Sequence, residues 1–175
     1  MSTLGYYLIS KITNYAKYLG ITNYISNNYD FYINQVDKHL WVSNLPTIKH
    51  KNKIQHIDVI ISFLNNSEYG NEQTLWIDKT NKRYYRIPVA DYTPPTQEDY
   101  EKLKKIIQQE KGNILIHCYA GKGRSNCGAC IYMMLKHKMN SNQAIKHIES
   151  KLPRSRMNVW QKQSVQKFSP LDTSD

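Results

Sequence analysis

Apolar residues follow two spacings along the chain, one typical of strands and the other typical of helices. Short runs rich in β-branched and aromatic residues predict strands, and each run is bounded by polar or turn-forming residues. The longest run, 58–64, has the composition of a strand buried on both faces. The predicted strands are 32–33, 40–42, 58–64, 75–77, 84–89 and 114–117.

Apolar residues at intervals of three and four predict amphipathic helices. Thr96 is placed to cap a helix with an acidic first turn that ends before Gly112. We expect Ser141 and Asn158 to cap the last two helices. The predicted helices are 1–28, a short lysine-rich helix at 46–53, then 97–109, 125–138, 142–151 and 159–168.

Strands interleaved with helices, followed by helices alone, are typical of an α/β domain with a central sheet covered on both faces. At 175 residues the chain has room for one such domain with a real core. We therefore divide it into an N-terminal amphipathic helical segment (1–28), a catalytic domain (29–168) and a tail (169–175) that we expect to be disordered.

The chain is strongly basic, with 24 Lys and Arg against 14 Asp and Glu and a formal net charge of +10. That excess favours anionic partners, namely phosphorylated protein, anionic lipid headgroups or RNA. The three cysteines have no framework spacing, which predicts a reducing, intracellular and cytoplasmic environment. We expect neither a transmembrane segment nor a signal peptide, because no run has the required pattern.

The N-terminal segment 1–28 has one apolar face and few charges. Packing of this face on the domain, or on a second copy to give a homodimer, is the main interpretation. The alternative is a helix that lies on an anionic membrane surface, although the segment is poor in basic residues for that role. The apolar face comprises Leu4, Leu8, Ile12, Tyr15 and Leu19.

The candidate chemistry lies in residues 114–125, where an apolar strand stops at His117-Cys118 and a glycine-containing loop leads into a helix. Backbone N–H groups converge at such a junction, where the helix dipole favours negative charge. Cys118 and Arg124 stand six residues apart around this loop. A helix N-terminus and a nearby cation favour the thiolate of a cysteine, and an arginine fork grips two phosphate oxygens. The loop thus predicts a nucleophile inside a phosphate clamp.

The loop supplies no carboxylate, so the general acid must come from elsewhere. Asp91 is the best candidate because it follows a predicted strand and precedes two prolines that stiffen its loop. Its alternative role is that of an ordinary turn former. Ser125 can donate its hydroxyl to the thiolate, and His117 is expected to brace the loop. We expect Cys127 and Cys130 to pack in the core rather than bind zinc, since no second pair of ligands accompanies them.

The run His117-Cys118-Tyr-Ala-Gly121-Lys-Gly-Arg124-Ser125 resembles the loop of the Cys-x5-Arg protein tyrosine phosphatase superfamily. Within it, the chain is most similar to small atypical dual-specificity phosphatases, because residues 89–95 resemble their acid loop and residues 152–161 their closing segment. The resemblance covers roughly 30–168. It implies a twisted sheet of about five strands flanked by helices on both faces, and hydrolysis through a phosphocysteine without a metal or a cofactor.

The resemblance also implies the site residues. The catalytic set is Cys118, Arg124, Asp91, Ser125 and His117, and the substrate-binding set is Tyr119, Ala120, Gly121, Lys122, Gly123 and Arg124. Two positions depart from the family pattern: Asn126 stands where glycine is usual, and Leu152 replaces a common arginine.

Two residues of the loop, Lys122 and Tyr119, leave the class of substrate undecided. We expect a phosphatase for phosphotyrosine in proteins, with phosphoserine and phosphothreonine also possible substrates. Lys122 also resembles the loop interior of inositol-lipid phosphatases, but Tyr119 stands where those usually have a second lysine. An RNA 5′-phosphatase fits the basic charge, although no aromatic-lined basic groove is evident. The non-enzymatic alternative is a phospho-binding pseudophosphatase.

Overall fold

The computed structural model describes residues 30–68 and 80–169, together with Ile12. Apart from Ile12, the helix predicted at 1–28 lies outside the described residues, as do the strand predicted at 75–77 and all but the first residue of the tail. Those elements, and the homodimer through 1–28, stay predictions.

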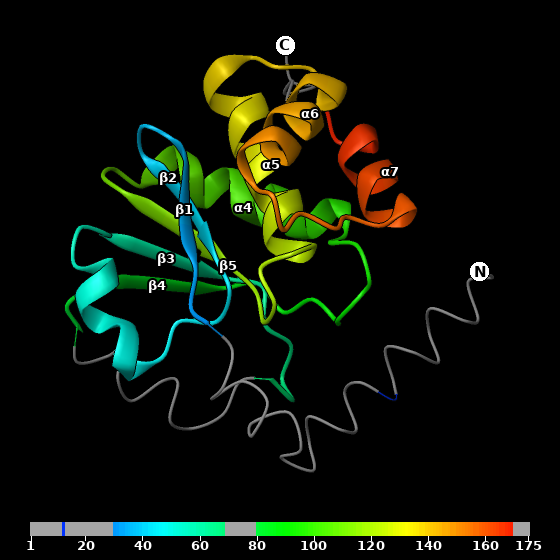
Figure 1. Cartoon of the computed structure of the whole chain (residues 1–175). Coiled ribbons are helices and arrows are strands. Elements are labelled where there is room, and N and C mark those ends of the chain that lie inside the picture. The colour runs from blue at the N-terminus through cyan, green and yellow to red at the C-terminus, as the bar shows by residue number, and fades with distance from the viewer. Residues whose placement is uncertain (1–11, 13–29, 69–79, 170–175) are drawn as a thin grey trace.

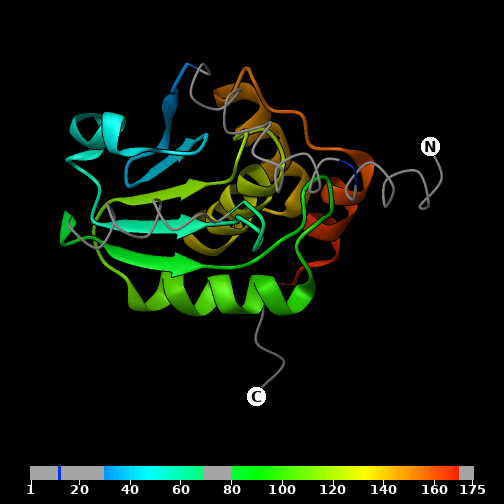
Figure 2. The same ribbon diagram turned by 90° about the horizontal axis from the view of Figure 1, so that it is seen from below.

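Within the described residues, five strands form one mixed sheet in the order β1-β2-β5-β3-β4. The edge strand β1 pairs antiparallel with β2, whereas β2, β5, β3 and β4 run parallel. Strand β5 is therefore central, and the parallel strands all end at one edge of the sheet (Figures 1 and 2). The strands are β1 (Ile33–Asp37), β2 (Leu40–Ser43), β3 (Val59–Ser62), β4 (Arg83–Arg86) and β5 (Ile114–His117).

Alternate positions of the central strands face two different cores. Val59 and Ile61 of β3 belong to the larger core, together with apolar residues of the α-helices. Ile60 points to the opposite face, where it joins a smaller cluster with Ile54 and Leu115. Since successive side chains of a strand point to opposite faces, this division fixes the register of β3 and β5. The predicted α/β fold with a central sheet is confirmed.

The helices of the described residues fill the C-terminal half of the chain, and the longest of them forms the centre of the larger core. Helix α5 is buried continuously from Arg124 to Met134, so it has no solvent-facing side over that length. The opposite face of the sheet carries a 3-10 helix, η1 (Ile48–Ile54), where the sequence predicted a short helix. The α-helices are α4 (Gln97–Gln109), α5 (Arg124–His137), α6 (Ser141–Lys151) and α7 (Val159–Lys167). None of the described helices is long and apolar enough to cross a membrane.

Three of these helices begin with a reciprocal capping box. Thr96 and Asn158 cap α4 and α7, as predicted. The prediction that Ser141 caps α6 is wrong, because Asn140 accepts the hydrogen bond from the Gln143 amide at 2.9 Å and Ser141 is the first helical residue. The Gln143 side chain returns a bond to the Asn140 amide, an exchange that a cap at Ser141 could not make with an alanine at the third position.

Two strands are shorter than their apolar runs. Strand β3 ends at Ser62 although Phe63 and Leu64 are fully buried, and β4 ends at Arg86 although Ile87 and Val89 are buried. Apolar character reports burial, whereas a strand also needs a hydrogen-bonded neighbour. The segments beyond these strand ends leave the sheet while staying in the core, and they lead directly to the loops around the candidate site.

Candidate active site

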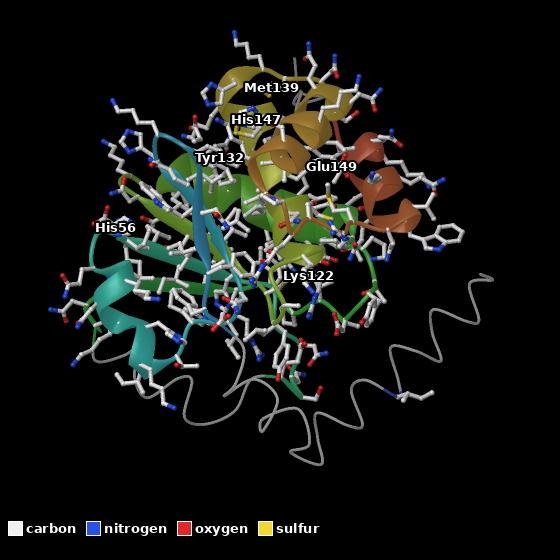
Figure 3. The ribbon with its side chains drawn as sticks, in the orientation of Figure 1. His56, Lys122, Tyr132, Met139, His147 and Glu149 are labelled. Carbon is white, nitrogen blue, oxygen red and sulfur yellow. The ribbon has the colours of Figure 1, made fainter. Side chains whose placement is uncertain are left out.

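The candidate phosphate loop, residues 118–123, connects the end of β5 to the start of α5 (Figure 1). Gly123 is the N-cap of α5, so the unpaired amides of the first helical turn face the loop. Cys118 lies at the mouth of the loop as a free, buried thiol. Lys122 is exposed at the outer side of the loop (Figure 3). This arrangement places a sulfur atom where a helix N-terminus favours an anion.

The backbone carbonyls of the phosphate loop bond to groups outside it. The amide of Leu45, just after β2, donates to the Tyr119 carbonyl at 3.0 Å. The hydroxyl of Tyr32 donates to the Gly121 carbonyl at 2.5 Å and also lies 3.0 Å from the Ala120 carbonyl. Three peptide carbonyls are thereby held by the segments at the start of β1 and the end of β2.

The fourth carbonyl, that of Lys122, receives two donors. The backbone amide of Arg156 lies 2.7 Å from it, and the side-chain amide of Asn126 lies 2.8 Å from it. Asn126 also donates to the Ser155 hydroxyl at 2.9 Å. The asparagine that replaces the family's usual glycine therefore joins the loop to the segment before α7, a contact that glycine could not make.

Outward carbonyls imply inward amides. In a trans peptide the carbonyl of one residue and the N–H of the next point in opposite directions. Bonds that hold the carbonyls of residues 119–122 outward therefore turn the amides of 120–123 toward the centre of the loop. The Gly121 amide lies there and donates to the Cys118 sulfur at 3.2 Å. The loop thus has the orientation needed to receive the oxygens of a phosphoryl group.

Position 121 requires glycine, both because of its backbone conformation and because of the atoms that surround it. Its φ of +66° lies in the left-handed region, which favours glycine. An added Cβ would lie 2.7 Å from the Ser43 carbonyl and 2.7 Å from the Asn44 amide, and closer still to the Tyr32 hydroxyl. Any larger residue would push the loop away from β2.

Arg124 is almost completely buried, and its guanidinium group is held from several sides. It makes a two-bond ion pair with Glu68, at 2.6 Å to Oε2 and 2.9 Å to Oε1. It also donates to two backbone carbonyls, at 3.1 Å to Phe63 and 2.9 Å to Val89. These carbonyls belong to the segments that continue beyond β3 and β4, so the sheet topology itself positions the arginine.

The second acid at Arg124 is Asp91. Its Oδ1 lies 3.0 Å from Nη2 of Arg124, and its side chain is 20% exposed. Burial acts to lower the pKa of Arg124, but hydrogen bonds to Glu68 and the charges of Cys118, Glu68 and Asp91 outweigh it, and the pKa is raised. The guanidinium therefore stays charged. The structure brings Asp91 to the phosphate loop although it precedes Cys118 by 27 residues.

The loop that carries Asp91 is fastened to the start of α7. Asn158 donates through its side-chain amide to the Tyr92 carbonyl at 2.9 Å, and Gln161 donates to the Thr93 carbonyl at 3.3 Å. Tyr92 itself has a positive φ of +62°, an uncommon backbone conformation for a residue other than glycine. The two amide donors hold the turn in the shape that directs Asp91 toward Arg124.

Ser125 and His117 flank the nucleophile at the two ends of the loop. The Ser125 hydroxyl is buried and lies 3.4 Å from the Cys118 sulfur, within reach as a donor. His117 lies 3.3 Å from the Cys118 carbonyl through Nδ1, and its Nε2 is a buried atom without a hydrogen-bond partner among the described residues. Burial lowers the pKa of His117 to about 4, so the ring is neutral near neutral pH.

The two other cysteines lie inside α5. Cys127 and Cys130 are fully buried, and burial raises the pKa of both thiols, that of Cys127 to about 12. They are therefore core residues, as expected from the sequence. No group of three potential metal ligands occurs among the residues that the structure describes.

Sequence reasoning missed two residues that touch the site, Tyr32 and Glu68. The sequence pattern places Tyr32 in a predicted strand and assigns no role to Glu68. Glu68 follows β3, which neighbours β5, whereas Tyr32 precedes β1, which is joined to β5 through β2. Both residues lie at the edge where the parallel strands end. A single carboxylate just after a buried strand was the available signal for Glu68, but its target depends on the strand order.

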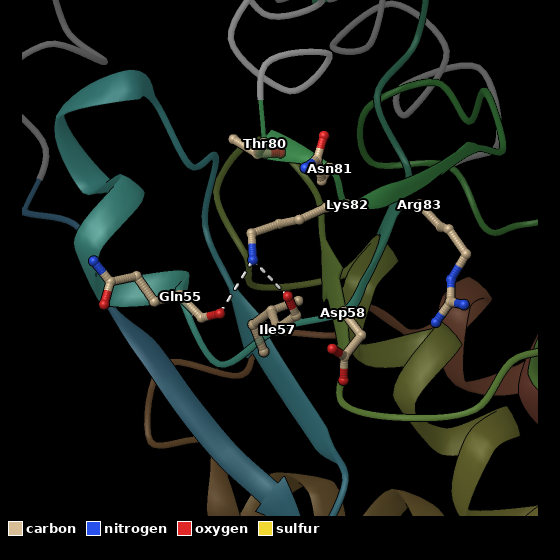
Figure 4. Close-up of a pocket in the computed structure, with 7 residues that line it drawn as sticks. All are labelled: Gln55, Ile57, Asp58, Thr80, Asn81, Lys82 and Arg83. Carbon is tan, nitrogen blue, oxygen red and sulfur yellow. Dashed lines mark hydrogen bonds between the residues drawn. The ribbon is translucent and has the colours of Figure 1, made fainter.

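A separate polar pocket of about 330 Å³ lies at the opposite end of the parallel strands (Figure 4). Lys82 crosses it and donates to the carbonyls of Gln55 at 3.3 Å and Ile57 at 2.5 Å. Asp58 accepts from the Asn113 amide at 2.7 Å. The charged side chains here tie the starts of β3, β4 and β5 together, which is a structural role.

The comparison with protein families agrees with this geometry. A family model described as "Dual specificity phosphatase, catalytic domain" matches residues 40–169, which is most of the chain. The fold and the site thus define a cysteine-based phosphatase domain. The chain belongs to the dual specificity phosphatase catalytic-domain family.

Two curated proteins are similar over part of the chain. The dual specificity protein phosphatase 1 of Arabidopsis thaliana is 36% identical over 74 residues, which is 40% of this chain and 37% of that protein. The tyrosine-protein phosphatase vhp-1 of Caenorhabditis elegans is 36% identical over 80 residues, which is 43% of this chain and 12% of that protein. Each match thus spans well under half of the relative's length.

Solved structures share the fold. A crystal structure of PTPMT1 in complex with PI(5)P superimposes with a TM-score of 0.67 at 16% sequence identity, over 77% of this chain and 92% of that chain. At this identity the likeness concerns the fold alone.

Proposed function

We propose that the chain is a protein phosphatase that hydrolyses phosphotyrosine, and with it phosphoserine and phosphothreonine, through a phosphocysteine intermediate. One observation carries the proposal. The Cys118 sulfur receives the Gly121 amide at 3.2 Å inside a loop whose outward carbonyls leave the amides free for phosphate oxygens.

In the first step, the Cys118 thiolate attacks phosphorus and the bond from phosphorus to the substrate oxygen breaks. Asp91 gives its proton to the departing oxygen, which leaves as a neutral hydroxyl group. The loop amides and Arg124 hold the three remaining phosphoryl oxygens, on which charge is spread in the transition state. The ion pair with Glu68 fixes the plane of the guanidinium for this task.

In the second step, a water molecule attacks the phosphorus of the phosphocysteine. Asp91 accepts a proton from that water, and the bond between phosphorus and sulfur breaks. Ser125, 3.4 Å from the sulfur, donates its hydroxyl to the departing thiolate. The products are inorganic phosphate and the restored Cys118 thiolate. This cycle needs a reduced thiol, which supports a reducing, cytoplasmic environment for the protein.

A second candidate substrate is an inositol lipid. Lys122 is exposed beside the phosphate loop, where its charge can meet a second phosphate. The fold neighbour PTPMT1 was crystallised with PI(5)P. The protein substrate remains the first candidate, since Tyr119 provides no cation next to Cys118.

The test is phosphate release from four substrate classes: phosphotyrosine peptides, phosphothreonine peptides, inositol phospholipids and 5′-triphosphorylated RNA. We expect phosphotyrosine peptides to be hydrolysed fastest by the wild type. Cys118→Ser should release no phosphate yet still bind the peptide. Turnover by Cys118→Ser would exclude the phosphocysteine mechanism. A wild type that binds phosphopeptide without turnover would favour the phospho-binding alternative.

A further inference from the structure

The hydroxyl of Tyr32 lies against the phosphate loop although Tyr32 is far from residues 117–125 in the sequence. It approaches two consecutive carbonyls, those of Ala120 at 3.0 Å and Gly121 at 2.5 Å. A phenol has one proton to donate, so the hydroxyl bonds the nearer Gly121 carbonyl and shares its proton with the Ala120 carbonyl, which brings two adjacent peptide planes to one group. Those planes carry the amides of Gly121 and Lys122, of which the first is bonded to the Cys118 sulfur.

Tyr32 is itself held at both ends. Its backbone amide donates to the Asn44 side chain at 3.1 Å, and the Asn44 side chain donates in turn to the Asp30 carbonyl at 3.2 Å. The guanidinium of Arg154 lies over its ring, 4.8 Å from the centroid, at a distance typical of a cation–π contact. The ring is thus fixed between the start of β1 and the segment that follows α6.

We propose that Tyr32 is a positioning residue of the phosphate loop: its hydroxyl holds the Ala120 and Gly121 carbonyls outward so that the next two amides face the bound phosphoryl group. The inference rests on the proposed function in taking the loop as a phosphate cradle. Tyr32 touches neither the reacting atoms nor, by this geometry, the phosphate.

Two other observations agree with this role. Burial, followed by the nearby Cys118 charge, raises the pKa of Tyr32, so the phenol keeps the proton that it donates. Gly121 has no side chain that could take over the support, and a Cβ there would collide with the same hydroxyl. The loop depends on an aromatic hydroxyl at this point because its own residues cannot brace these planes.

The experiment compares Tyr32→Phe with wild type and with Tyr85→Phe. The control loses a hydroxyl of the same kind from β4, one that donates to Glu110 at the end of α4. Inorganic phosphate and orthovanadate are titrated by calorimetry, and kcat and KM are measured for an aryl phosphate. We expect Tyr32→Phe to bind both anions about fivefold more weakly, the loss typical of one hydrogen bond, and to show a reduced kcat with a raised KM. Tyr85→Phe should match wild type in both.

The result that overturns the inference is Tyr32→Phe with wild-type anion affinity and kinetics. A Tyr32→Phe protein that fails to fold, judged by circular dichroism, would also overturn it, because the role assigned is in the loop and not in the stability of the domain. If wild type itself bound neither anion, the loop would not be an oxyanion cradle. Anion binding is independent of substrate choice, so a wild type that binds phosphate without hydrolysing phosphopeptides would contradict only the proposed function.

Discussion

Arg124 and Glu68 form a two-bond ion pair in the interior, at 2.6 Å and 2.9 Å, with the guanidinium and carboxylate side chains 1% and 0% exposed. The glutamate compensates the charge of the arginine, and its Oε1 shares Nη2 of Arg124 with Oδ1 of Asp91. Such a pair is weak support for stability in itself, but the loss of one partner leaves an uncompensated buried charge.

Glu68→Gln should therefore damage both stability and activity. We expect the free energy of unfolding in urea to fall by about 3 kcal/mol. We expect kcat/KM for an aryl phosphate to fall by ~10²-fold, because the guanidinium loses its fixed orientation. The matched control is Glu98→Gln on the exposed surface of α4, which should change neither quantity. Full activity in Glu68→Gln would show that the backbone carbonyls alone orient Arg124.

The proposed general acid is tested through the leaving group. Asp91→Asn keeps the shape of the side chain but cannot supply a proton. Turnover of phosphotyrosine, whose leaving group is poor, should fall by ~10²–10⁴-fold. An aryl phosphate with a strongly acidic phenol needs no proton and should lose far less. An equal loss of turnover for both substrates would show that the general acid is another residue.

Asn158 both anchors the acid loop and caps α7, and one substitution can separate these two roles. Asn158 donates to the Tyr92 carbonyl and also accepts the Gln161 amide as the cap of α7. Asn158→Asp keeps the acceptor and loses the donor. We expect turnover of poor leaving groups to fall about fivefold, the effect of one hydrogen bond, with thermal stability close to wild type.

Two outcomes would contradict this assignment for Asn158. One is wild-type turnover of phosphotyrosine in Asn158→Asp. The other is an equal loss for the substrate with the acidic phenol, since that substrate does not depend on the position of Asp91.

His117 predicts a specific dependence of stability on pH. Its pKa is about 4 in the folded chain, against 6.5 for the ordinary group, chiefly because of burial. The unfolded chain thus binds a proton at higher pH than the folded chain does. This difference in pKa adds to the free energy of unfolding. The contribution is fully present above pH 6.5 and is lost as the pH falls from 6.5 toward about 4, by up to about 3 kcal/mol.

Urea unfolding at several pH values across this range measures the effect. In His117→Asn the decline between pH 6.5 and 4 should be smaller than in wild type by that amount, because asparagine does not titrate. If the free energy of unfolding fell equally with pH in the two proteins, the pKa of His117 would not differ between the folded and unfolded chains, and the prediction would be wrong.

The local parts of the site could be predicted from the sequence, whereas the parts that depend on strand order could not. Cys118, Arg124 and Ser125 lie on one short loop, so their spacing determines their relation. Asp91 was located because the end of a strand and two prolines mark a stiff loop. Glu68 meets the loop only because β3 flanks β5, and Tyr32 only because β1 pairs with β2 on the other side of β5. No local pattern reports that neighbourhood.

The same distinction holds for the fold. Within residues 30–68 and 80–169, periodicity located the helices to within a residue or two, and the capping residues of α4 and α7 were identified from their chemistry. The ends of β3 and β4 were overestimated, because the Phe63 and Val89 side chains stay in the larger core while their carbonyls bond to Arg124 instead of to a neighbouring strand. An apolar run cannot distinguish the two causes of burial.

Helix α5 begins at the phosphate loop and is buried continuously through its first three turns. We expect the amides of residues 124–134 to exchange with solvent mainly when the whole domain opens, since this length of the helix has no solvent-facing side. An oxyanion bound at its N-terminus is therefore linked to the global unfolding equilibrium rather than to a local one. At concentrations above Kd, phosphate should raise the melting temperature of the entire domain in proportion to the logarithm of the phosphate concentration. The thermal transition therefore reports how much phosphate is bound at the loop.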